Sequence, residues 1–204
     1  MKMFVKKIMK TTINLFTSIA LLLATINSTA QNRVSIDNET STLNWTGKKV
    51  LGEHTGTIKL ANSFIVLDEK GVKNGEINIE MTSITNTDME GEWSDKLVGH
   101  LKSADFFDTE KHPNATFTIN EVIHKSETLH LASGILTIKG ISNPLSFPIQ
   151  IKNTDSMMEI TGLAEVDRTL YDVKYGSASF FDSLGDKAIN NLFELNFDLK
   201  VKRK

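Results

Sequence analysis

Apolar and polar residues alternate along most of the chain after residue 40. The last segment is the clearest case, because every second residue from Phe193 to Val201 is apolar and those between are polar or charged. An extended chain points successive side chains to opposite faces, whereas a helix would scatter these residues around its circumference. The alternation therefore predicts a β-strand with one apolar face.

The same period of two recurs upstream and predicts a protein built from strands. Turn signals at 68–71 and 139–144 separate several of the segments. About eight strands, each with one dry face, are typical of an antiparallel barrel or sandwich. The alternating segments are 77–81, 115–119, 145–151 and 158–166, and further strands are expected at 42–49, 55–67 and 129–139.

One segment departs from this period. In residues 92–103 the apolar positions from Trp93 to Leu101 are spaced four, one and three apart, which predicts a short helix. Ser94 and Asp95 are expected to cap its first turn. Such a helix would lie across the mouth of a barrel, where its apolar face must bury against strand ends or a ligand.

The first 30 residues have the three-part pattern of a secretory signal peptide. Four lysines in residues 1–10 precede an almost uncharged run, and small residues, Ser28 and Ala30, stand at the minus-three and minus-one positions before Gln31. A membrane anchor is the alternative, but the run falls short of about eighteen apolar residues. We therefore expect a cleaved segment 1–30, a periplasmic or secreted protein without stable membrane insertion, and one mature domain at 31–204.

Composition narrows the classes of function. Removing the four lysines of the leader from the 23 Lys and Arg leaves 19 cations against 25 acids. This negative balance argues against nucleic acid as a partner, because phosphate binding needs clustered cations. The chain has no cysteine, so it has no disulfide, thiol nucleophile or thiolate metal site, and core burial must stabilise the fold.

Several motifs together resemble those of a known family. The strongest is HLKSADFFD at 100–108, and the match spans roughly residues 42–202. The motifs resemble those of the YceI-like, polyisoprenoid-binding proteins. That resemblance implies an all-β, lipocalin-like extended antiparallel β-barrel of about eight strands, exported to the periplasm, with a long apolar tunnel for an isoprenoid chain or similar amphiphile. The other motifs are His112-Pro113, Thr116-Phe117, GILTIKG at 134–140, Asn143-Pro144, Phe147-Pro148 and Val166-Asp167-Arg168.

The stretch 100–112 also contains imidazole and carboxylate side chains, which bind metals or take part in catalysis in other proteins. Its imidazoles and carboxylates are zinc ligands in type, but its histidines lack the i, i+4 spacing that places two on one helical face. The structural alternative is that the aspartates accept backbone N–H bonds in a turn while Phe106 and Phe107 plug the barrel end. No G-x-S-x-G elbow is present, so we expect no catalytic residue, cofactor or metal. The four candidates are His100, Asp105, Asp108 and His112.

Ten residues are candidates for the lining or mouth of a tunnel, and most have a structural alternative. Lys48 and His54 either hold a ligand headgroup or face solvent. Arg168 either contacts a headgroup or forms an ion pair that ties strands together. Tyr175 and Phe180 either line the tunnel or pack in the core. The full set is Trp45, Lys48, His54, His100, Phe106, Phe107, Phe147, Arg168, Tyr175 and Phe180.

Three hypotheses of function follow. The first is a carrier or store for a long isoprenoid or fatty lipid, held by burial of its methylenes. The second is a hydrolase that uses the His100 to His112 group, which the lack of a nucleophile motif disfavours. The third is a ligand-free barrel with a structural or stress-related role. Alternation leaves a tunnel and a filled core equally open, and it leaves homodimerisation open.

Overall fold

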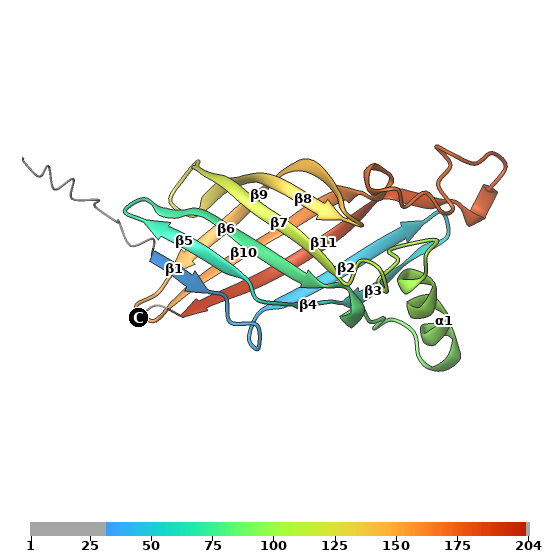
Figure 1. Cartoon of the computed structure of the whole chain (residues 1–204), viewed down its shortest axis with the longest axis horizontal. Helices are drawn as coiled ribbons and strands as arrows, with labels where there is room; N and C mark the ends of the chain where they lie inside the picture. Colours follow the sequence, from blue (N-terminus) through green and yellow to red (C-terminus); the bar gives the residue numbers. More distant parts are fainter. Residues whose placement is uncertain (1–31, 203–204) are drawn as a thin grey trace, which may run out of the picture. The chain divides into compact units, whose positions relative to one another are not determined.

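The computed structural model describes residues 32–202, which form one antiparallel sheet of eleven strands and one α-helix (Figure 1). The leader expected at 1–30 lies outside the described residues. Strand order is β1-β5-β6-β7-β8-β9-β10-β11-β2-β3, with β4 beside β6. The strands are β1 (Asn32–Ser35), β2 (Thr42–Lys49), β3 (Gly52–Thr57), β4 (Lys59–Leu60), β5 (Phe64–Asp68), β6 (Gly71–Glu80), β7 (Asn114–His124), β8 (Leu129–Ile138), β9 (Ile141–Asn153), β10 (Met157–Asp167) and β11 (Ile189–Lys202); the helices are α1 (Gly91–Lys102) and the 3-10 turns η1 (Met81–Ser83), η2 (Arg168–Tyr171) and η3 (Gly185–Lys187).

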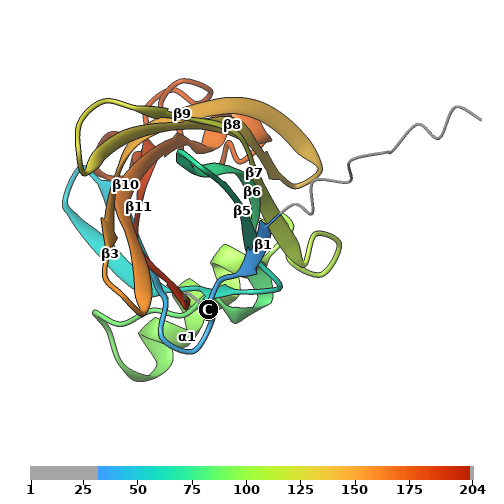
Figure 2. The same cartoon turned by 90° about the vertical axis from the view of Figure 1, so that its left-hand side faces the viewer.

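The sheet curls into a barrel, as Figure 2 shows in the view along its length. Within residues 32–202 the end strands of the sheet, β1 and β3, do not pair with each other. The wall closes where the chain after β1 reaches β11, because Asp37 N–H donates to the Lys200 carbonyl (2.8 Å). The predicted lipocalin-like, antiparallel barrel is therefore confirmed.

The predicted strand at 55–67 is three strands. The chain pairs with β2 up to Thr57 and with β6 from Lys59, so it changes partner at Ile58. The apolar–polar alternation continues across this change of partner strand, since Ile58 and Leu60 are both buried. The pattern reports which side chains are dry and carries no information about which strand lies alongside, so the sheet has eleven strands where the pattern indicated about eight.

The helix α1 forms where its spacing predicts and lies at one end of the barrel (Figure 1). It starts at Gly91, so Ser94 and Asp95 lie inside the helix and do not cap it; the N-cap is Glu90, which makes no side-chain capping bond. Leu101 is buried, whereas Trp93 is 71% exposed. The expected apolar face is therefore buried only at its C-terminal end.

The turn predicted at 139–144 is shorter than its Gly and Pro residues suggest. Lys139 and Gly140 both have positive φ, 50° and 73°, as a two-residue type I′ hairpin turn requires. The next strand, β9, already begins at Ile141 and contains two prolines, Pro144 and Pro148. Both are tolerated because this part of β9 pairs on one side only, with β8.

Candidate ligand-binding site

Two apolar cavities lie inside the barrel. Cavity 1 has a volume of about 70 Å³, and every side chain that lines it is apolar. Cavity 2 has a volume of about 100 Å³ and extends towards α1, where Leu101 is part of its wall. Arg168 lines cavity 2 and is the only charged residue among the described residues that line either cavity. Apolar cavities of this kind stay dry and take up hydrocarbon in preference to water.

The two cavities are neighbours along the barrel. Four residues, Ile79, Leu136, Val166 and Leu195, line both of them, and these come from four different strands. Their side chains lie where the two cavities adjoin. A long chain that occupied both cavities would have to displace these aliphatic side chains, which rotate without breaking any hydrogen bond.

Aromatic rings line each cavity. In cavity 1 Phe147 packs between Phe117 and Phe197, with ring centroids 5.2 and 5.7 Å away. In cavity 2 Phe107 lies between Phe106 and Phe193, at 5.0 and 6.2 Å. Trp45 also lines cavity 2, and its indole N–H donates to the Thr85 carbonyl (2.9 Å). The predicted lining residues Trp45, Phe106, Phe107 and Phe147 thus all border a cavity.

Arg168 is only 2% exposed and follows directly on β10. Its Nε, Nη1 and Nη2 donate to the carbonyls of Asn190 (3.0 Å), Val173 (2.7 Å) and Ile189 (3.1 Å). No carboxylate in residues 32–202 forms an ion pair with it, so the interstrand ion pair considered above is not found. Burial lowers the pKa of the guanidinium, which still stays charged because arginine is effectively always protonated in proteins.

An aromatic cluster lies next to this cation, and its Phe106 ring is the one nearest to the guanidinium. The Phe106 ring lies 5.5 Å from the guanidinium carbon of Arg168. His100, on α1, contacts Phe106 and Tyr175 edge-on, with ring centroids 5.5 and 4.4 Å apart. His100 Nε2 is buried and has no hydrogen-bond partner within the described chain. Neither His100 nor Tyr175 lines cavity 1 or cavity 2, and His100 reaches cavity 2 only through its contact with Phe106.

Three other predicted site residues lie away from both cavities. Lys48 pairs with Glu194 on the outer face of β2 and β11. His54 Nδ1 lies 2.8 Å from a carboxylate oxygen of Asp88. Phe180 is 49% exposed, 5.3 Å from the Lys174 ammonium. These side chains do not line either cavity, because strand alternation places Lys48 outside and the others lie beyond the strands that enclose the cavities.

The four residues considered as zinc ligands do not come together. Within residues 32–202 no three His, Cys, Asp or Glu side chains form a cluster able to hold a metal ion. The Asp108 carboxylate accepts from the Lys111 ammonium (3.0 Å), while its backbone carbonyl accepts the N–H groups of Lys111 and His112. The turn is therefore held by the Asp108 backbone, not by carboxylates that accept N–H groups as expected.

Most of the residues that line the cavities were not predicted as site residues. Phe117, Phe197 and Leu195 border the cavities, yet they were identified only as strand residues. Their alternation was the available signal, since every inward position of a barrel strand is a candidate for the lining.

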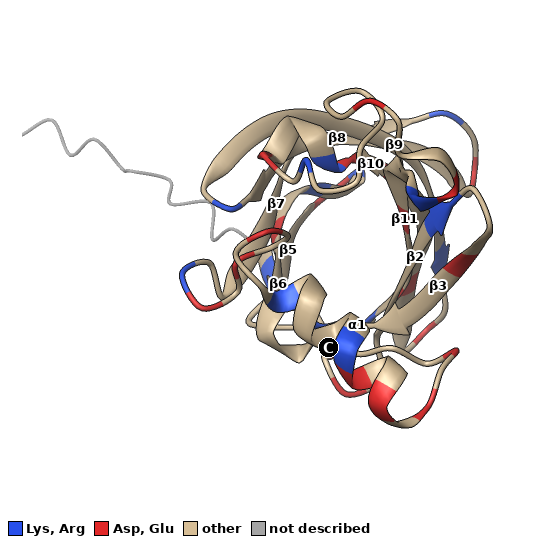
Figure 3. Cartoon of the chain, turned by 90° about the vertical axis from the view of Figure 1, so that its right-hand side faces the viewer, with Lys and Arg blue, Asp and Glu red and all other residues tan. Residues whose placement is uncertain are grey.

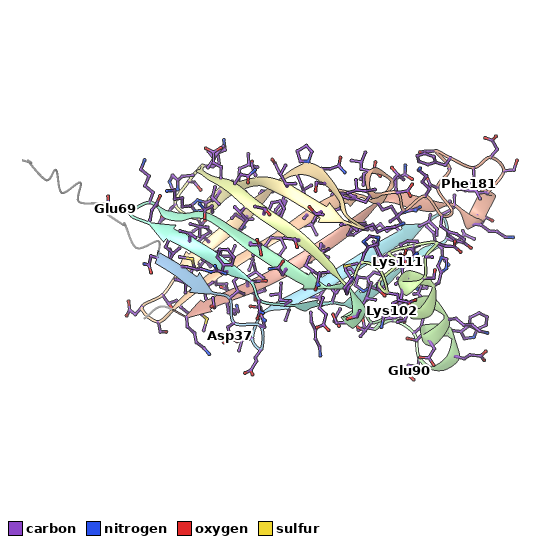
Figure 4. The ribbon with its side chains drawn as sticks, viewed as in Figure 1. Asp37, Glu69, Glu90, Lys102, Lys111 and Phe181 are labelled. Carbon is purple, nitrogen blue, oxygen red and sulfur yellow. The ribbon has the colours of Figure 1, made fainter. Side chains whose placement is uncertain are left out.

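The outer surface near the mouth carries charges of both signs. Figure 3, which looks at this end, shows lysines and acidic residues interspersed around α1 and the strand ends. Figure 4 places the half-exposed Phe181 at the same end as Lys102 and Lys111, away from Glu69. In the described part of the chain, helices are too short or too polar to cross a lipid bilayer.

The fold and the interior together define a lipocalin-like barrel with an apolar interior. The chain belongs to the YceI-like domain family, whose family model matches residues 35–201. Protein YceI of Escherichia coli O157:H7 is 32% identical over 96 residues, which are 47% of this chain and 48% of that protein. The UPF0312 protein plu2095 of Photorhabdus laumondii is 33% identical over 90 residues, or 44% of each chain. The matches span about half the length of these curated relatives.

Solved structures share the fold over most of the chain. BcnA of Burkholderia cenocepacia superposes with a TM-score of 0.68 at 17% identity, covering 81% of this chain and 98% of BcnA. A polyisoprenoid binding domain from Saccharophagus degradans, implicated in plant cell wall breakdown, gives 0.62 at 15% identity, covering 85% and 99%. At such identities the likeness establishes the architecture only.

A histidine pair at the other end of the barrel predicts pH dependence. His124 and His130 face each other across β7 and β8, with ring centroids 5.0 Å apart. Burial, and then the neighbouring His124, lower the pKa of His130. The unfolded chain therefore binds a proton more readily, so the stability contributed by neutral His130 is present above about pH 6.5 and is lost as pH falls below it.

We expect urea unfolding at pH 7.5 and 5.5 to give a larger loss of stability on acidification for the wild type than for His130→Gln. The carboxylates titrate in both proteins, so the difference isolates the imidazole. An equal loss in both would contradict this assignment.

Proposed function

We propose that this protein binds a long-chain isoprenoid, or a similar amphiphile such as a fatty lipid, inside the barrel and carries or sequesters it. The observation that carries the proposal is a pair of adjoining apolar cavities that end at one buried guanidinium. Family membership supports it, as does the shared fold of the S. degradans domain, which is described as polyisoprenoid-binding.

The tail would be held by burial alone. Each methylene transferred from water to an apolar wall contributes about 0.8 kcal/mol, and the wall of cavity 1 offers no polar group that would compete. Repeating branched units suit such a wall because they require no directional bond. The chain would displace the aliphatic side chains that lie where the two cavities adjoin.

The headgroup would lie beside Arg168. A guanidinium has five N–H donors, and three of them bond the carbonyls of Val173, Ile189 and Asn190. One N–H on each terminal nitrogen has no acceptor within the described chain, and the residue lines cavity 2. An acceptor-rich head, such as a phosphate or a quinone oxygen, would complete its bonding.

We further propose that the protein acts after export, in the periplasm or outside the cell, on the basis of the leader pattern at 1–30. No chemistry on the ligand is needed for this role. The hydrolase hypothesis has lost its main support, since its four residues do not assemble into one site. A ligand-free barrel is the remaining alternative.

Extraction of natively purified protein tests the proposal directly. We expect mass spectrometry of the organic extract to contain a prenyl or other long-chain lipid in stoichiometric amount. After delipidation, adding a prenyl phosphate at about one hundred times its dissociation constant should stabilise the fold by about 2.7 kcal/mol. An empty extract, together with no stabilisation by any long-chain lipid, would favour the ligand-free barrel.

Phe147→Ala separates a lined cavity from a filled core. Removing a phenylalanine from a filled core costs about 3–5 kcal/mol. Phe147 is only half-buried and borders cavity 1, so we expect a smaller loss in the delipidated protein and weaker stabilisation by added lipid. Urea unfolding measures both.

Phe180→Ala is the matched control, because this ring is half-exposed and borders no cavity. It should leave stability and lipid response unchanged. A full core-sized loss for delipidated Phe147→Ala, with an unchanged lipid response, would contradict the assignment of Phe147 to the ligand wall.

A further inference from the structure

The ladder between β9 and β10 is incomplete. Residues Met158 to Gly162 of β10 pair with Asn153 to Ile149 of β9, and the pairing stops there. From this point β9 continues beside β8 alone and β10 beside β11 alone. We call the unpaired edges, 141–148 of β9 and 163–167 of β10, the β9–β10 seam (Figure 1).

Proline explains where the ladder stops. In the β9–β10 hairpin Thr154 N–H donates to the Met157 carbonyl (2.8 Å), and this bond fixes which residues along β9 turn their N–H groups towards β10. They are every second residue before Thr154. The first of these beyond the paired region is Pro148, opposite Leu163 if the register continued, and it has no N–H to donate.

A second proline, Pro144, lies four residues before Pro148 on β9 and so points its nitrogen to the same side, towards β10. Both prolines are exposed on the outer surface. The seam therefore lacks two of the donors that would close it. Its far end is held by a side chain, because Asn143 Nδ2 donates to the Leu170 carbonyl (3.0 Å). The unpaired stretch is therefore bounded at one end by the β9–β10 ladder and at the other by this hydrogen bond.

The seam forms part of the wall of cavity 1. Leu145 and Phe147 on β9 and Ala164 and Val166 on β10 all line that cavity. The two β10 residues are buried, whereas the two on β9 are only half-buried. Between these strands the cavity is closed by side-chain contact, without a backbone ladder.

The two ends of the barrel are less suited to passage. At one end Leu101, Phe106 and Phe107 are buried and cover cavity 2. At the other, a crevice of about 620 Å³ between β1 and β11 is lined partly by charged residues, Arg33, Asp37 and Lys202 among them, and shares no lining residue with cavity 1. The seam reaches cavity 1 directly, between exposed Leu163 and Leu170.

We propose that the β9–β10 seam is a lateral portal through which the lipid chain enters and leaves the barrel, an inference that rests on the proposed lipid-binding function. Parting paired strands would break a ladder of backbone hydrogen bonds, whereas parting the seam breaks no such ladder and only the side-chain hydrogen bond from Asn143 to the Leu170 carbonyl. The chain slides in sideways, tail against Leu145, Phe147 and Ala164, without threading end-on past α1.

A disulfide across the seam tests the portal. The continued register sets Ser146 opposite Glu165, both facing outwards, and the chain has no cysteine of its own. S146C/E165C staples the seam when oxidised. The control is Q150C/T161C, a pair on the same two strands that is already in register. The probe is cis-parinaric acid, a fluorescent long-chain fatty acid, with uptake and release followed by stopped flow.

We expect oxidation of S146C/E165C to slow uptake and release by about tenfold or more, at nearly unchanged affinity, as a gate that controls both directions would. Reduction should restore both rates, and the control should show no change. Pro144→Thr with Pro148→Thr, which restores two N–H donors to the seam, should slow exchange without any cross-link and keeps the test decisive where the disulfide forms poorly.

The possible outcomes distinguish failure of the portal proposal from failure of the proposed lipid-binding function. Binding of the probe at rates that neither the staple nor the proline replacements change would overturn the portal and leave the lipid-binding function standing. A wild type that binds neither this probe nor any prenyl lipid would overturn both.

Discussion

Replacing Arg168 by methionine is expected to lower the free energy of unfolding by about 3 kcal/mol or more. The guanidinium satisfies three backbone carbonyls, those of Val173, Ile189 and Asn190, at a side chain that is 2% exposed. Each buried acceptor left without a donor costs about 1–3 kcal/mol. Methionine fills much of the volume but donates nothing, so the segment that leads into β11 would lose its anchor.

Arg168→Lys is the informative companion. It keeps the charge but cannot present the planar fork that reaches three acceptors at once, so an intermediate loss is expected. Urea unfolding of delipidated proteins measures both variants. A loss below about 1 kcal/mol for Arg168→Met would mean that water satisfies these carbonyls. It would also shift the role of Arg168 from structure towards the ligand headgroup.

Gly134→Ala is expected to destabilise the barrel by about 2–3 kcal/mol, because the strand has no room for a side chain at this position. A Cβ built on Gly134 would lie 2.1 Å from the Thr118 carbonyl oxygen and 3.0 Å from two atoms of the Phe117 ring. The neighbouring strand must shift, and Phe117 borders cavity 1. Lipid binding should therefore weaken together with stability.

Gly47→Ala is the matched control, because Gly47 is also a strand glycine. Its Cβ would meet only the Trp45 ring, at 3.8 Å, and alanine restricts the unfolded chain, so a gain of about 0.5 kcal/mol is expected. Thermal and urea unfolding decide between the two. Equal effects of both substitutions would show that close approach at Gly134 is not what its strand requires.

Local pattern was enough to identify most of the elements. The alternation at 193–201 and 158–166 predicted β11 and β10, because the direction of a strand side chain depends only on its own backbone. The spacing from Trp93 to Leu101 predicted α1 for the same reason. The capping residue and the exposed Trp93 were predicted wrongly, since both depend on where the helix meets the barrel.

Which strands pair with each other could not be predicted from the local pattern. The chain changes neighbour at Ile58 without any break in its alternation, and β9 starts at Ile141 despite the prolines that follow. Which strand lies alongside depends on segments far away along the chain. The same limit hid the β9–β10 seam, where Pro148 matters only because β10 lies on that side.

The features of the candidate site also divide into those predicted from the sequence and those decided by the tertiary structure. Alternation alone marked Phe147 as inward-facing, and the sequence motifs between residues 100 and 168 together indicated the family that the match to residues 35–201 then established. That Arg168 would bond carbonyls and no carboxylate, that Lys48 would pair with Glu194 outside, and that the interior would hold two adjoining cavities were decided by tertiary structure. The alternation of apolar and polar residues shows which side chains avoid water. The space left between those side chains depends on how all the strands pack together.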